Sequence, residues 1–330
     1  MKYIDLHLHL DGSLPAQTLF KLAEIESITL PAQSPEDLTQ YITADINCES
    51  LNDYLAKFDI PLAVLQSGEA LETAAYELMA ELKDKNIAYA EIRFAPGSHG
   101  RRGLSQRDAA EAVVSGIKRG TADFGVEAQA ILCCMRGPVN DALMASHRET
   151  VDVAGDLLGR GVCCVDIAGA EAIFPNEEFE YLFRYANKRD VPFVAHGGEA
   201  SGSNSIKAAA LAGARRIGHG VTLTDDPELV EYIIKNNICI ESCITSNVQT
   251  RAVKALAAHP LRRMLNAGVP VTLNTDNMTV SGTDMEAEFS RAKETFGLSD
   301  AEITRLQENA VQAAFLNDEE KQRLREKLFD

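Results

Sequence analysis

Residues 2–10 read KYIDLHLHL, a run in which apolar and polar side chains alternate, as in a β-strand that carries two histidines near its end. Seven further runs rich in apolar and β-branched residues follow, at 87–95, 126–135, 162–168, 191–196, 215–219, 237–244 and 270–276. Segments with helical spacing lie between them, at 107–122, 176–189, 203–213, 226–236 and 254–267. Because strands that alternate with helices form βαβ units, eight such strands predict an α/β fold, a closed (β/α)8 barrel.

The chain shows no point at which it divides into domains. Its 330 residues fit within a single barrel, and no Pro/Gly-rich linker or low-complexity segment interrupts them. We therefore expect residues 1–330 to form one domain. The alternative fold, an open doubly wound sheet, would need a glycine-rich turn for a nucleotide phosphate, and the sequence contains neither GxGxxG nor GxxxxGK followed by Ser or Thr.

Two segments go beyond a minimal barrel. The connection between the first two runs is unusually long, and within it four side chains recur at i, i+3, i+4 and i+7 on one helix face: Leu51, Tyr54, Leu55 and Phe58. This stripe fits either packing on the barrel wall or a lid over the barrel mouth. After the eighth run, Ser299-x-x-Glu302 predicts a capping box that begins a helix through about Phe315, and a charged helix follows from about 318.

Composition and charge narrow the function class. Lys and Arg total 32 against 49 Asp and Glu, a formal charge of −17 that would repel nucleic acid, so we expect a small-molecule ligand instead. No apolar run is long enough for a signal peptide or a membrane span, which predicts a cytoplasmic protein without a membrane partner. Seven cysteines without a Cys-x-x-Cys pair favour reduced thiols over a thiolate zinc site. Nothing in the sequence indicates the oligomeric state.

Four of the seven histidines stand at predicted strand ends. His7 and His9 point to the same face because strand side chains alternate, while His196 and His219 end the fifth and sixth runs. Asp276 ends the eighth run, which adjoins the first when a barrel closes. Taken alone, a His-x-His pair or a turn aspartate is a weak signal. Together, three imidazoles and a carboxylate form a set suited to Zn²⁺, with an open position for a water whose pKa falls toward about 7.

The order of these motifs resembles the adenosine deaminase family of the amidohydrolase superfamily. The motifs are Asp5-Leu-His7-Leu-His9-Leu-Asp11-Gly-Ser13, Asp166-Ile-Ala-Gly169-Ala-Glu171, His196-Gly-Gly-Glu199, Arg216-Ile-Gly-His219-Gly and Leu273-Asn-Thr-Asp276, spaced over essentially the whole chain. The resemblance implies a TIM barrel with one catalytic zinc. It also implies a hydrolase acting on a cyclic amidine C–N bond, which converts adenosine, and 2′-deoxyadenosine, to inosine and ammonia in purine salvage.

The resemblance also assigns roles to residues of the metal centre. The zinc ligands would be His7, His9, His196 and Asp276. Glu199 would protonate purine N1 as hydroxide adds to C6, a role that suits a carboxyl group at the purine edge. His219 would serve as a base or electrostatic support, Asp276 would also orient the attacking water, and Asp166 would act from behind the ligands.

Substrate contacts are implied in the same way. They would come from His9, Asp11, Gly169 and Asn277, with the helix of Leu51, Tyr54, Leu55 and Phe58 covering the pocket. The N–H of Gly169 would reach purine N3, and Asp11 would accept from the ribose 5′-hydroxyl. Many relatives have a second Asp where this chain has Asn277, and that Asp resembles a partner for N7. Because N7 only accepts, an Asn amide can donate to it directly, and we expect recognition to survive.

Rival functions remain at this stage. Adenine or a modified adenosine could use the same chemistry, whereas AMP is disfavoured because Asp11 would repel a phosphate. Binuclear amidohydrolases usually bridge two metals with a Lys from the fourth strand, which here reads Val162-Cys-Cys-Val-Asp166 without one. A catalytically inactive relative would be expected to have lost a metal ligand or the acid. Here every predicted ligand position and the acid position hold the expected residue, which argues against that reading.

Overall fold

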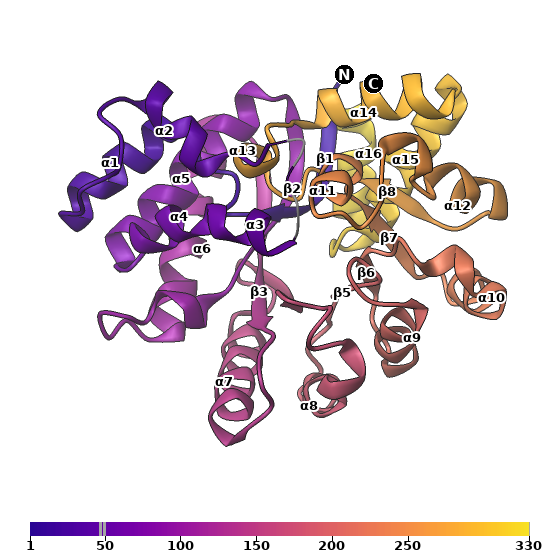
Figure 1. Cartoon of the computed structure of the whole chain (residues 1–330), viewed down its shortest axis with the longest axis horizontal. Helices are drawn as coiled ribbons and strands as arrows, with labels where there is room; N and C mark the ends of the chain where they lie inside the picture. The colour runs from indigo at the N-terminus through magenta and orange to yellow at the C-terminus, as the bar shows by residue number, and fades with distance from the viewer. Residues whose placement is uncertain (46–47, 49–50, 330) are drawn as a thin grey trace.

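The computed structural model describes residues 1–45, 48 and 51–329, without the side chains of residues 51 and 52. Within these residues the structure contains eight strands, each inside or close to a predicted run. They are β1 (Tyr3–His9), β2 (Ile87–Phe94), β3 (Glu127–Met135), β4 (Val162–Ala168), β5 (Ala195–Gly197), β6 (Arg216–His219), β7 (Cys239–Ser242) and β8 (Val271–Leu273). Figure 1 shows them at the centre of a ring of helices.

The strands close into the predicted barrel. Two parallel four-stranded sheets, β1 to β4 and β5 to β8, are joined by a bridge between Val165 and Phe193 and by another between Leu8 and Asp276. At the second junction the His9 N–H donates to the Asp276 carbonyl, and the Asp276 N–H donates to the His7 carbonyl, both at 2.8 Å. The closure of the barrel therefore brings Asp276 beside the two histidines of β1.

The helices that follow the strands pack apolar faces on the barrel wall. They are α5 (Gly68–Asp84), α6 (Gln106–Phe124), α7 (Asp141–Leu157), α8 (Glu180–Lys188), α9 (Ser203–Ala212), α10 (Pro227–Lys235), α12 (Leu261–Ala267) and α14 (Met285–Phe296). The prediction of one helix over 254–267 was wrong, because α12 begins only after Pro260. A proline disfavours helical geometry in the residue before it, and His259 is extended, with φ −63° and ψ 136°.

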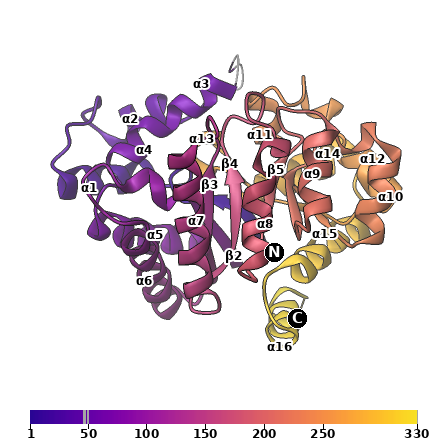
Figure 2. The same cartoon turned by 90° about the horizontal axis from the view of Figure 1, so that it is seen from below.

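Extra helices cover both ends of the barrel. Between β1 and β2 lie α1 (Ala16–Glu26), α2 (Pro35–Ile42), α3 (Leu51–Leu55), η1 (Ala56–Phe58) and α4 (Asp59–Ala63). Figure 2 shows α3 at the same end as α11 (Ile244–Gln249) and α13 (Met278–Ser281), with α16 (Asp318–Phe329) at the opposite end. The predicted capping box at Ser299 is confirmed, and it begins α15 (Asp300–Ala313). None of the helices described reaches the length and hydropathy of a membrane span.

Candidate active site

A cavity of about 270 Å³ opens where the strands end. The predicted residues that line it are His9, Asp11, Gly169, His196, Glu199, His219, Asp276 and Asn277, with Tyr54, Leu55 and Phe58 above them. The side chain of Leu51 lies outside the described part of the chain. A larger, more open hollow of about 800 Å³ at the other end of the barrel is lined by Arg215, Arg305 and Lys321 but by no His, Asp or Glu. Ionisable groups suited to acid–base chemistry therefore line the smaller cavity.

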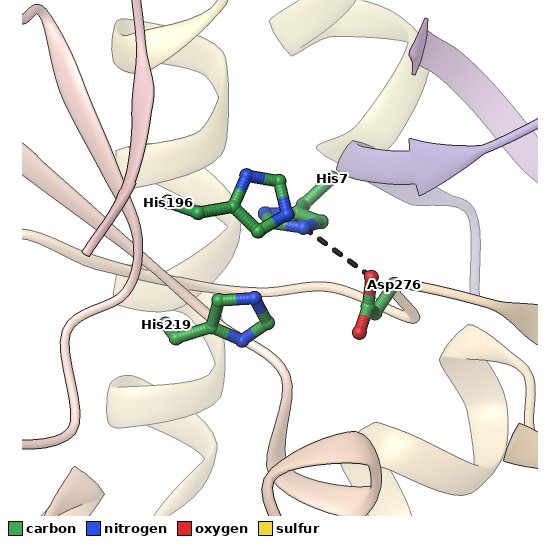
Figure 3. Close-up of side chains that lie close together, drawn as sticks. All are labelled: His7, His196, His219 and Asp276. Atoms are coloured by element: carbon green, nitrogen blue, oxygen red, sulfur yellow. Dashed lines mark ion pairs between the residues drawn. The ribbon is translucent and has the colours of Figure 1, made fainter. Parts of the chain in front are cut away.

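Four side chains from separate strand ends converge at the floor of this cavity. Figure 3 shows His7, His196, His219 and Asp276, whose potential ligand atoms all lie within 4.8 Å of one another. His9 adjoins them, since its Nε2 lies 3.3 Å from both His196 Nε2 and Asp276 Oδ1. The structure thus brings together all four predicted metal ligands, with His219 as a fifth nearby group.

Carboxylates lie behind two of the imidazoles. His7 Nδ1 lies 2.7 Å from Glu241 Oε2, and His196 Nδ1 lies 3.0 Å from Asp166 Oδ2. Because a carboxylate only accepts, His7 Nδ1 donates to Glu241 and carries a ring hydrogen. His196 Nδ1 lies within ion-pair distance of Asp166 but makes no hydrogen bond. His7 Nε2 is buried and has no hydrogen-bond partner. The ring nitrogens of His7 and His196 face the same space as the Asp276 carboxylate, a group of donors that could hold a divalent cation.

An arginine forms ion pairs with both supporting carboxylates. Arg93 is fully buried and donates to Asp166 Oδ2 at 2.8 Å and to Glu241 Oε2 at 2.9 Å. Burial alone would raise the pKa of Glu241, but Arg93 and Arg216 outweigh it and hold that pKa below its ordinary value. Sequence reasoning missed Glu241. Its signal was a lone charge inside the otherwise apolar run Cys239-Ile-Glu241.

Two residues at the site adopt backbone conformations that are rare outside glycine. His219 and Asp276 have φ values of 66° and 62°. Such geometry persists only where surrounding contacts impose it, and it is concentrated at functional sites. Ser246 contributes one such contact, because its hydroxyl donates to Asp276 Oδ2 at 2.6 Å. Asp276 is therefore held with Oδ1 toward the imidazoles.

Glu199 lies beside the cluster on a loop that Glu171 organises. The Glu171 carboxylate accepts from the N–H groups of Gly198, Glu199 and Ala200 at 2.7 to 2.9 Å. Burial raises the pKa of Glu199 to about 8, and the charges of Asp276 and Glu171 add to this effect. Glu199 consequently holds a proton at neutral pH and can act as an acid.

The outer cavity wall carries the predicted substrate contacts. Asp11 Oδ1 is buried without a hydrogen-bond partner, and burial raises the pKa of Asp11 to about 6. Gly169 has a φ of 108°, which favours glycine, so that the backbone itself forms the wall. Asn277 Nδ2 donates to the Tyr54 hydroxyl at 2.9 Å. This hydrogen bond connects α3, which contains Tyr54, to the cavity wall. Tyr54, Leu55 and Phe58 therefore cover the site as a lid would.

Comparison with known proteins places this geometry in a family. A sequence model of the family described as Adenosine deaminase matches residues 3–330. This chain belongs to the adenosine deaminase family. An adenosine deaminase from Haemophilus ducreyi is 42% identical over 325 residues, which cover 97% of this chain and 94% of that protein. The enzyme class of the adenosine deaminase family, a hydrolase of C–N bonds in cyclic amidines, is therefore confirmed for the chain.

Solved structures agree with the predicted fold. The crystal structure of an adenine deaminase from Arthrobacter aurescens superposes with a TM-score of 0.87 at 27% identity, covering 99% of this chain and 97% of that one. An Arabidopsis N6-mAMP deaminase gives a TM-score of 0.85 at 27% identity, with the same shares covered. The barrel predicted from the sequence is thus confirmed, and the adenosine deaminase family shares it with enzymes named for other aminopurines.

Proposed function

We propose that this protein deaminates adenosine, and 2′-deoxyadenosine, by zinc-dependent hydrolysis to inosine and ammonia. The observation that carries the proposal is a single cavity beside a nitrogen and oxygen cluster fit for a metal, lined by the buried carboxyl group of Glu199, whose pKa is raised to about 8. The relative from Haemophilus ducreyi, at 42% identity, is named adenosine deaminase and supports the same substrate.

The donor set fits zinc at His7, His9, His196 and Asp276. Three imidazole nitrogens and one carboxylate oxygen are typical ligands of Zn²⁺, and the carboxylates behind His7 and His196 fix the ring orientation that binding needs. A bound zinc ion supplies a Lewis acid that makes water nucleophilic near neutral pH. Asp276 Oδ1 lies beside the ligand nitrogens, where it can orient that water.

Glu199 performs the proton transfer. When water adds to purine C6, electron density rises at N1, and a neutral carboxyl group there can donate its proton to N1. Its buried position keeps it protonated for this step. His219 lies across from it, with Nε2 at 3.7 Å from Glu199 Oε2, and stabilises the charge that develops between them.

The outer cavity suits a nucleoside. Asp11 Oδ1 lacks a partner and would accept from the ribose 5′-hydroxyl, the N–H of Gly169 would reach N3, and the Asn277 amide would donate to N7. A phosphate at the ribose end would meet the carboxyl group of Asp11, so we expect AMP to be a poor substrate. The second candidate substrate is free adenine or a modified adenosine, which the likeness to the Arthrobacter aurescens adenine deaminase favours.

A substrate panel tests the proposal. The purified protein, analysed for metal, is offered adenosine, 2′-deoxyadenosine, adenine and AMP side by side, with ammonia release and ultraviolet absorbance as readouts. Rapid conversion of both nucleosides with little action on adenine or AMP is the expected result. If zinc-loaded protein deaminates adenine but not adenosine, the second candidate substrate replaces the proposed one.

A further inference from the structure

A row of buried side chains leads from the start of α12 to the active site. The Leu261 N–H donates to His259 Nδ1 at 3.2 Å, and His259 Nε2 lies 3.0 Å from Asn247 Oδ1. Asn247 Nδ2 in turn lies 2.9 Å from His219 Nδ1. His259 and Asn247 are buried and neither lines the cavity. The side-chain hydrogen bond from Asn247 to His219 therefore connects these two residues to the cavity.

The backbone fixes the direction of every hydrogen bond in this row. An N–H group can only donate, so His259 Nδ1 must accept from Leu261 and cannot carry a hydrogen. Its ring hydrogen is therefore on Nε2, which donates to Asn247 Oδ1. Burial lowers the pKa of His259 to about 3, in agreement with a ring that carries a single hydrogen. With its oxygen occupied in this way, Asn247 turns its NH₂ group toward His219.

The reverse orientation of Asn247 cannot be satisfied. An exchanged amide would place its NH₂ group against the Nε2–H of His259, two donors face to face at 3.0 Å. Moving the ring hydrogen to Nδ1 would only transfer the conflict to the Leu261 N–H. Since all three side chains are buried, no solvent can relieve an unmatched donor.

We propose that Asn247 and His259 are positioning residues that keep the ring hydrogen of His219 on Nε2, where it faces Glu199 and the metal cluster. This rests on the function proposed above, which gives His219 its role. His219 Nδ1 accepts from Asn247, so Nε2 must carry the hydrogen. A nitrogen that carries a hydrogen offers no lone pair to a metal, which excludes His219 as a ligand despite its place in the cluster. It also makes His219 a hydrogen-bond donor, not a base, toward the reacting groups.

Nuclear magnetic resonance tests the proposal without any substrate. In zinc-loaded protein labelled with ¹⁵N-histidine, two-bond ¹H–¹⁵N correlations distinguish the two neutral tautomers of each ring. We expect His219 and His259 both to show the form with hydrogen on Nε2. His219 with its hydrogen on Nδ1 overturns the proposal, whether or not the protein deaminates adenosine. If the tautomers are as expected but the protein does not deaminate adenosine, the proposed function is overturned. The assignment of Asn247 and His259 as positioning residues for His219 then still stands.

Substitutions test whether the row controls the tautomer. In Asn247→Asp both oxygens can only accept, so His219 should move its hydrogen to Nδ1, and kcat should fall about 10–100-fold with little change in KM. The matched control is Asn236→Asp on the exposed end of α10, which should alter neither the spectrum of His219 nor kcat. An unchanged His219 tautomer in folded Asn247→Asp would contradict the proposal.

A second pair of variants covers the case in which Asn247→Asp does not fold. His259→Gln retains an NH₂ group near the position of Nε2, whereas His259→Leu removes the donor. We expect the Gln variant to keep the His219 tautomer and most of kcat, and the Leu variant to lose both while KM changes little. Equal kcat in the two folded variants would show that His259 only fills space.

Discussion

At the scale of single residues, the site depends on pairs whose partners determine what each group can do. Glu241 accepts from His7 Nδ1, Asp166 forms an ion pair with His196, and the burial of Glu199 raises its pKa to about 8. The sequence identified the strand-end groups because period-2 alternation and barrel closure bring them together. It could not identify Glu241 as the partner of His7, because spacing along the chain does not show which inward side chains meet across a barrel.

The first prediction concerns Glu199. Glu199→Gln preserves size but cannot supply the proton, so kcat should fall by at least about 100-fold while the metal content stays unchanged. The measurements are steady-state kinetics on adenosine and elemental analysis of the same sample. Glu178→Gln, an exposed site, is the matched control and should behave as the unsubstituted protein. Full turnover in the Glu199→Gln variant would contradict the role of Glu199 as the proton donor.

The second prediction is a pH dependence. Glu199 must be protonated to act, and burial raises its pKa to about 8, so kcat should be lost as the pH rises through that value. A bound cation favours the ionised form, which places the midpoint of the zinc-loaded protein at or below about 8. A kcat profile for adenosine between pH 6 and 10 checks this. Turnover that stays constant up to pH 10 would contradict the assignment of the acid.

At the scale of elements, the strands were predictable and some helices were not. Each apolar run became a strand because a barrel buries both faces, and the Ser299 capping box correctly placed the start of α15. The prediction of one helix over 254–267 was wrong because the apolar spacing of this segment continues across Pro260, where the backbone cannot remain helical. For the stripe at Tyr54, Leu55 and Phe58, the sequence could not decide between packing on the barrel wall and a lid over the barrel mouth. Only the fold shows what a helix face covers.

The third prediction belongs to this covering segment. Phe58 lines the cavity and contacts Tyr54, with ring centroids 6.2 Å apart. Phe58→Ala removes apolar contact with the bound substrate, so KM for adenosine should rise about tenfold, with a smaller change in kcat. Phe329→Ala on α16, at the far end of the barrel, should leave KM unchanged. If Phe58→Ala has the same KM for adenosine as the control Phe329→Ala, η1 does not contact the substrate.

At the scale of the whole molecule, closure of the barrel both builds the site and links the ends of the fold. The hydrogen bonds between Asp276 and the strand of His7 and His9 join β8 to β1, so the predicted metal ligands come together only when the barrel is complete. We propose that residues 1–330 form one domain. The fourth prediction is a single cooperative unfolding transition, with the same midpoint by circular dichroism and calorimetry. Two separate transitions would show independent units.

The measurement that tests the central claim most directly is a zinc titration of metal-depleted protein, with the conversion of adenosine to inosine followed by ultraviolet absorbance. We propose that His7, His9, His196 and Asp276 form one metal site beside the cavity that Glu199 lines. We predict that activity rises in proportion to added zinc and reaches its plateau at about one ion per chain. Full activity without metal, or a plateau at two ions per chain, would contradict this account.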